Sequence, residues 1–189
     1  MKKVFIFIAV LFAVMACNPK VDFNELMEDD YITASIEFPD SDVRLYEVQT
    51  VMSNPANAEK NEILASSTII QVGRDSVKQI DRIYHNSKIV EEVETIKKGI
   101  WLGDFEIKLD SIKYTLNDAL AIARQYDSVP SEPFMTFRKP VAPPFRMQYI
   151  FGSKDTYYMT VDAITGEVNT FENSLHEEIF GAINSITTE

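Results

Sequence analysis

The chain has 189 residues and is acidic, with 18 Lys and Arg against 29 Asp and Glu and a net charge of −11 at pH 7. Nucleic acids and anionic lipid surfaces repel such a charge, which argues against a function in polyanion binding. Its 12 Phe and 8 Tyr beside only 6 Gly are typical of a packed sheet protein and not of a disordered chain.

Residues 1–16 have the pattern of a secretory signal peptide. Lys2 and Lys3 precede an apolar run from Val4 to Met15, which falls short of the roughly 20 residues that a membrane-spanning helix needs. We therefore expect residues 1–16 to be removed after export. Removal takes away the two lysines, so the net charge changes from −11 to −13.

The apolar run ends in Val14-Met15-Ala16-Cys17. These four residues resemble the bacterial lipobox, and the resemblance implies cleavage before Cys17, a diacylglycerol on its thiol and a fatty acyl chain such as palmitate on its new amino group. Several acyl chains hold a protein firmly on a membrane, because each buried methylene contributes about 0.8 kcal/mol. Asn18 favours the outer membrane of a Gram-negative cell, by analogy with enteric bacteria. Cys17 is the only cysteine, so no intramolecular disulfide holds the fold.

The residues after the cysteine are expected to be a lipidated tether over residues 17–30, polar and acidic with one helical turn. Residues 31–38 alternate weakly between polar and apolar side chains, which predicts a half-buried strand. This strand opens a mainly β portion that we expect over residues 31–110.

Further strands of this portion are predicted from alternation and β-branched residues, between turn signals rich in Gly, Pro, Asn and Asp. The predicted strands cover residues 43–51, 63–72 and 77–84, and residues 53–61 are expected to be a loop. A short helix remains an alternative for residues 43–51. Residues 89–100 permit a helix as readily as a strand.

A helix is predicted from about Leu116 to Tyr126. Thr115 and Asp118 stand in the positions of a capping box, and apolar residues follow at helical spacing. Strands are then expected at residues 134–138, 145–151, 156–161 and 167–171, with a short helix in the tail, residues 173–189.

The last two strands are expected to form a hairpin. Asp162 is predicted to cap its turn through the side chain, and Gly166 to adopt a positive φ, a conformation that glycine reaches without a steric cost. Both residues are therefore interpreted as structural parts of the turn.

The predicted helix contains the sequence Asp-Ala-Leu-Ala-Ile-Ala, which starts at Asp118, and the predicted hairpin contains the sequence Val-Asp-Ala-Ile-Thr-Gly-Glu-Val, which starts at Val161. Through these two sequences, roughly residues 111–172 resemble a PepSY-type module. Residues 99–104, 137–140 and 149–152 extend the likeness to uncharacterised lipoproteins of Gram-negative bacteria with PepSY-like or β-lactamase-inhibitor-like folds. The resemblance implies an α+β fold in which a helix packs on an antiparallel β-sheet. It also implies binding or restraint of a peptidase, and it implies no catalytic residue. Residues 31–100 carry no second copy of the helix-and-hairpin pattern, which argues against a tandem repeat.

No catalytic, metal or cofactor site is expected. His85 and His176 are the only histidines, and no Gly-x-Ser-x-Gly nucleophile elbow is present. Zinc requires clustered Cys and His ligands, and the paired acidic residues lack the spacing of a calcium loop. We therefore expect a protein that is not an enzyme.

Three aromatic residues are candidates for a binding surface. Trp101 is the only tryptophan, and it is either an exposed platform for a sugar or peptide or, as we prefer, a core anchor before the helix. Tyr157 and Tyr158 leave the same two alternatives open.

Two functions remain, and neither involves nucleic acid. One is a non-catalytic module that binds or inhibits another envelope protein through its sheet face or loops. The other is a structural or accessory subunit of an outer-membrane complex. An exposed apolar patch on the sheet favours the first, and a buried sheet face with an acidic exterior favours the second.

Overall fold

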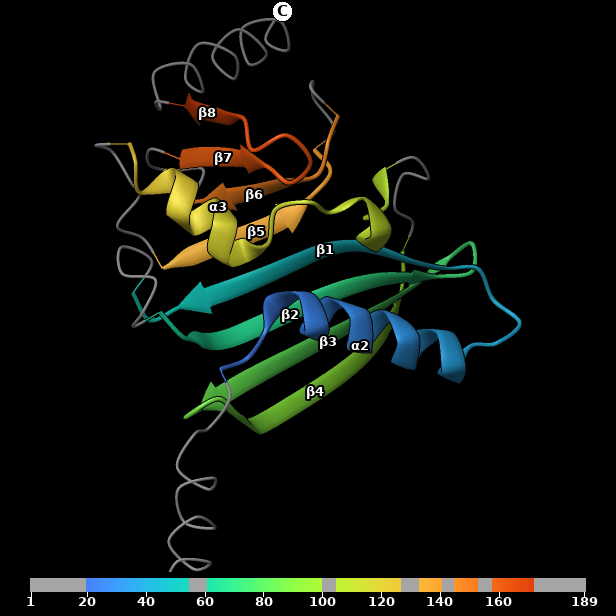
Figure 1. The fold of residues 1–189 in the computed structure, drawn as a ribbon. Helices are drawn as coiled ribbons and strands as arrows, with labels where there is room; N and C mark the ends of the chain where they lie inside the picture. Colours follow the sequence, from blue (N-terminus) through green and yellow to red (C-terminus); the bar gives the residue numbers. More distant parts are fainter. Residues whose placement is uncertain are drawn as a thin grey trace, which may run out of the picture.

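The computed structural model describes residues 20–54, 61–99, 105–126, 133–140, 145–152 and 158–171, without the side chains of Tyr158 and Phe171. Over these residues the chain has an α+β fold, with two α-helices and one eight-stranded sheet in the order β4-β3-β2-β1-β5-β6-β7-β8 (Figure 1). All neighbouring strands pair antiparallel. The predicted class, α+β with an antiparallel sheet, is confirmed.

The same order of elements, a helix followed by four strands, occurs twice. The N-terminal half contains α2 (Phe23–Glu37), β1 (Val43–Met52), β2 (Ile63–Val72), β3 (Ser76–His85) and β4 (Lys88–Lys98). The C-terminal half contains the 3-10 helix η2 (Leu109–Ser111), then α3 (Leu116–Ala123), β5 (Phe134–Arg138), β6 (Gln148–Phe151), β7 (Tyr158–Asp162) and β8 (Val168–Phe171). Pairing of β1 with β5 joins the halves into one sheet. The sequence analysis argues against a tandem repeat, and the structure corrects this. The two halves repeat the same order of elements, although their amino-acid sequences do not repeat.

Helix α2 replaces the predicted tether and first strand, so both interpretations are wrong over residues 23–37. The helix begins after Asp22, whose carboxylate accepts hydrogen bonds from the backbone N–H groups of Asn24 and Glu25 at 2.8 and 3.2 Å. Its buried residues recur at helical spacing and run across both predicted segments: Phe23, Leu26, Met27, Asp30 and Ala34.

The core contains apolar side chains of both helices and of strands from both halves. The ring of Phe23 on α2 lies 5.9 Å from the ring of Phe137 on β5 and 6.2 Å from that of Tyr149 on β6. The hydroxyl of Tyr149 donates to the backbone carbonyl of Tyr114, just before α3, at 2.8 Å. In Figure 1 both helices are seen in front of the sheet. One core therefore serves both halves.

Most of the other element predictions hold. Strand predictions at residues 43–51, 63–72, 77–84 and 134–138 are confirmed, and residues 89–98 form a strand, one of the two alternatives left open. The capping box is confirmed, because Thr115 and Asp118 each accept a hydrogen bond from the backbone N–H of the other. Helix α3 ends at Ala123, earlier than predicted, and β6 begins at Gln148. The predicted tail helix lies outside the described residues.

Candidate functional site

The sheet has one face turned away from α2. Thr68 on β2 belongs to the face that meets the helix, because its hydroxyl donates to a carboxylate oxygen of Asp30 on α2 at 2.6 Å. Successive side chains of a strand point to opposite faces, so Ser67 belongs to the other face. Gln49 on β1 and Asp81 on β3 pair directly with Ser67 and share this face, which is called the open face below.

A hollow with a volume of about 320 Å³ lies over the strands β1 to β5. The register of the strands places ten of its lining side chains on the open face: Gln49, Val51, Ala65, Ser67, Asp81, Ile83, Glu91, Val93, Phe134 and Thr136. The hollow is therefore a depression of the open face and not a gap between helix and sheet.

Apolar side chains form a continuous row along this hollow. Val51 pairs with Ala65 on one side and with Phe134 on the other, and Ala65 pairs with Ile83, so the row crosses four neighbouring strands. Ile83 is 47% exposed, Phe134 50%, and Val93 in the adjacent row 45%. Contiguous exposed apolar side chains of this kind are typical of an interaction surface.

Two carboxylates lie beside the apolar row. Asp81 accepts hydrogen bonds from the side-chain amide of Gln79 at 3.0 and 3.1 Å, and the same amide donates to the hydroxyl of Ser67 at 3.2 Å. Glu91 is exposed on the edge strand β4. Over the part of the chain that the structure describes, neither carboxylate has an ion pair with a basic residue. By contrast, Glu47 on the same face pairs with Arg138 at 3.3 Å.

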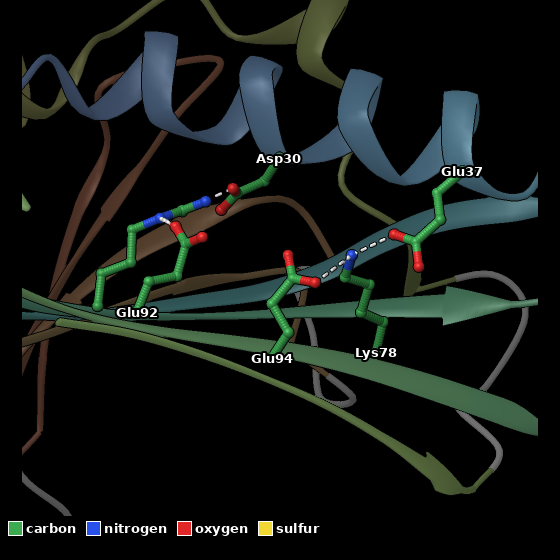
Figure 2. A network of polar contacts seen from close by, with 6 residues as sticks. Asp30, Glu37, Lys78, Glu92 and Glu94 are labelled. Carbon is green, nitrogen blue, oxygen red and sulfur yellow. Dashed lines mark hydrogen bonds and ion pairs between the residues drawn. The ribbon is translucent and has the colours of Figure 1, made fainter.

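The opposite face carries two acid–base–acid rows, which connect α2 to the edge strand β4 through β3 (Figure 2). In the first row, Lys78 lies between Glu37 on α2 and Glu94 on β4, and its Nζ is 3.0 Å from Glu94. In the second row, Arg82 lies between Asp30 and Glu92. These rows fill the space between α2 and the outer strands, where other parts of the molecule use apolar side chains.

The ionisation of these groups is coupled to their burial. Burial raises the pKa of Asp30, although Thr68 and Arg82 act in the opposite direction. Burial also disfavours the charge of Lys78, but the hydrogen bonds and ion pairs with Glu37 and Glu94 outweigh it and raise the pKa of the lysine. The rows are thus a polar contact between helix and sheet, and we assign them a structural role.

The predicted turn residues lie as expected. Asp162 is buried, and its Oδ1 accepts from the backbone N–H groups of Ile164 and Thr165 at 2.8 and 2.9 Å. Its other oxygen lies 2.9 Å from Nε of Arg146. Gly166 has a φ of +73°, which confirms the predicted positive φ. These contacts lie in the hairpin and beside it, whereas the hollow lies over β1 to β5.

The structure does not describe the side chains of the other predicted site residues. Cys17, Trp101 and Tyr157 lie outside the described residues, and Tyr158 begins β7 without a described side chain. Among the residues described, no three His, Cys, Asp or Glu side chains are grouped as metal ligands would be. The sequence does not predict the hollow, because the patterns around Ile83, Val93 and Phe134 indicate strands but not which strands become neighbours.

Comparison with solved structures finds a similar fold. The crystal structure of a candidate lipoprotein from Clostridium difficile 630 matches with a TM-score of 0.50 and 12% sequence identity, over 83% of this chain and 97% of the other. This likeness concerns the fold alone. No family model matches the chain, and no curated protein matches it. Within the described residues, neither helix combines the length and hydropathy required to cross a membrane.

Proposed function

We propose that this protein is a non-catalytic, lipid-anchored module that binds another envelope protein through the hollow on its open face. The observation that carries the proposal is the row of exposed apolar side chains from Ile83 to Phe134 on the face turned away from α2. A patch of this kind was the feature expected of a binding or inhibitory module, and it disfavours a purely structural subunit of an outer-membrane complex.

The anchor is proposed to be Cys17. The lipobox-like run before it supports this, and so does the fold shared with a protein described as a candidate lipoprotein. Helix α2 begins at Phe23, only a few residues after the cysteine, so the domain would lie close to the membrane. Asn18 supports the outer membrane as the destination.

A role in restraining a peptidase is the finer form of the proposal. Its support is the resemblance of α3 and the hairpin Val161–Val168 to a PepSY-type module. The described residues that line the hollow offer amide, hydroxyl and carboxylate groups beside apolar ones, and none of them is a histidine or cysteine. This set suits recognition of a protein surface, since interfaces combine an apolar centre with a polar rim.

Photo-crosslinking in the native envelope tests the site. A photoreactive phenylalanine analogue is placed at Ile83 or Phe134, in the full lipidated protein, and at the exposed positions Glu28 and Tyr126 as controls on helix α2 and just after α3. We expect one discrete adduct, shared by the two open-face positions and absent from both controls. Adducts from the controls alone, or the same adducts from all four positions, would contradict the proposal.

A further inference from the structure

We infer that the hollow accepts a cationic side chain of the partner, a lysine or arginine, with its charged end at Asp81 and Glu91 and its aliphatic stem on the apolar row. This inference rests on the proposed function, which makes the partner a protein. It adds the chemical character of the partner residue that enters the hollow.

The first argument is the lack of a basic partner for these two carboxylates among the residues that the structure describes. Two other carboxylates of this strand pair, Glu92 and Glu94 on β4, lie on the helix-facing side. Arg82 forms an ion pair with Glu92, and Lys78 forms one with Glu94. Asp81 and Glu91 lie on the same two strands but on the open face, where the described residues supply them no ion pair. The strand pair therefore neutralises its acidic residues on one face and leaves two of them unneutralised on the other.

The second argument is the position of the two groups. Asp81 pairs with Val93, and Ile83 pairs with Glu91, so the two carboxylates are diagonal neighbours on one face. Diagonal neighbours are about 7–8 Å apart, which is close enough for one cation to interact with both. Like charges on neighbouring strands repel each other, and a cation bound between them removes that repulsion.

The third argument is the character of the surrounding surface. Val93 and Ile83, each nearly half exposed, lie directly opposite Asp81 and Glu91 respectively. Lysine and arginine bury their methylene stems on apolar surface while the charged end stays with polar partners. A purely apolar partner residue would leave the two carboxylates desolvated without a partner, which is costly.

The fourth argument concerns the basic residue that lines the hollow. Arg82 contributes to the lining, but its guanidinium is on the helix-facing side, where it forms ion pairs with Asp30 and Glu92. It therefore cannot neutralise the open face without breaking the contact with α2. No other described residue forms an ion pair with Asp81 or Glu91, and the net charge of −13 expected of the mature chain attracts a basic partner over a distance.

Binding of small probes tests the inference. Hexylguanidinium is titrated into the full lipidated protein in zwitterionic nanodiscs, with 1-hexanol and hexanoate as probes of equal stem length, and backbone amide NMR shifts are followed. We expect hexylguanidinium to shift the amides of Asp81, Glu91 and Val93. The double variant Asp81→Asn, Glu91→Gln should weaken this binding about tenfold or more, since it removes two charge-assisted contacts.

The matched control is the double variant Asp29→Asn, Glu28→Gln, which removes the same charges from the exposed side of α2. It should leave the binding of hexylguanidinium unchanged. Equal shifts with 1-hexanol, or equal affinity in the Asp81 and Glu91 double variant, would overturn the inference. Repeating the envelope crosslink from Ile83 in that variant separates the two proposals. An adduct that persists in this variant would support the proposed function but contradict the inference of a cationic partner residue. The absence of any open-face adduct in the unmodified protein would contradict the proposed function itself.

Discussion

Nη1 of Arg82 on β3 lies 2.6 Å from Oδ1 of Asp30 on α2, and the side chain of Asp30 is only 1% exposed. A buried carboxylate is costly unless it is paired and hydrogen-bonded. Asp30 meets both conditions, since Thr68 also donates to it at 2.6 Å. The arginine therefore holds the middle of α2 on the sheet, at a point where the helix buries an acid instead of an apolar residue.

Replacing the two basic residues of β3 should have unequal effects. Arg82→Met leaves the carboxylate of Asp30 buried without its cation and should lower the free energy of unfolding by about 3–5 kcal/mol. Lys78→Met leaves Glu37 and Glu94, whose side chains are 44% and 43% exposed and remain solvated. It should change stability by less than about 1 kcal/mol, because no carboxylate is left buried and ion pairs with such exposed carboxylates contribute little. Urea unfolding of both variants measures the difference, and equal losses would contradict this assignment.

The raised pKa of Asp30 makes a prediction about pH. In the folded state burial raises it above 3.8, so the folded protein binds this proton more readily than the unfolded chain does. Stability from this group is therefore greatest at low pH and falls as the pH rises through the folded-state pKa. Asp30→Asn removes the titration. As the pH rises above about 4, the unmodified protein should therefore lose unfolding free energy relative to the Asp30→Asn variant. A difference that is constant with pH would show that Asp30 does not titrate in this way.

The strands could be predicted because their signals are local. Residues 63–72 and 77–84 combine β-branched residues or alternation with turn signals on both sides, and both form strands. The turn between β3 and β4 is equally local, with positive φ at Asn86 and Ser87. Helix α3 was indicated by its capping box, which depends on Thr115 and Asp118 alone.

Helix α2 could not be predicted in the same way. One of its buried positions is Asp30, which breaks the apolar stripe that would have indicated a helix, and the reason for its burial is Arg82, far along the chain. The hollow could not be predicted either, because it also depends on contacts between distant parts of the chain. Val51 and Phe134 become neighbours only through the pairing of β1 with β5, and no local pattern carries that register.

The lipid anchor has its own test. Cys17→Ser removes the thiol that the lipobox-like run presents, so we expect a precursor that is neither acylated nor cleaved at that position. Metabolic labelling with an alkyne-bearing fatty acid measures acylation, and the mass of the purified protein measures cleavage. Ala16→Gly, which keeps a small residue before the cysteine, is the control and should still be labelled. Label that remains on the Ser variant would contradict the proposed anchor.

The hairpin turn allows the sharpest stability test, because strain and a steric contact meet at one residue. Gly166 has a φ of +73°, and a Cβ placed there would lie 3.0 Å from the ring of Tyr114. Gly166→Val should therefore lower the free energy of unfolding by at least about 1–3 kcal/mol, the usual cost of a strained backbone position.

Thr165→Ala is the neighbouring control. Its hydroxyl is exposed and accepts a weak hydrogen bond of 3.3 Å from the backbone N–H of Glu167, so its loss should cost less. The variant Gly166→Ala isolates the effect of the branch, since alanine has the strain of the positive φ and the close Cβ but lacks the two methyl groups of valine. Chemical denaturation gives all three midpoints, expected in the order Thr165→Ala, Gly166→Ala, Gly166→Val from highest to lowest. A Gly166→Val protein with an unchanged midpoint but without its envelope adduct would reverse the structural assignment and make the turn part of the binding surface.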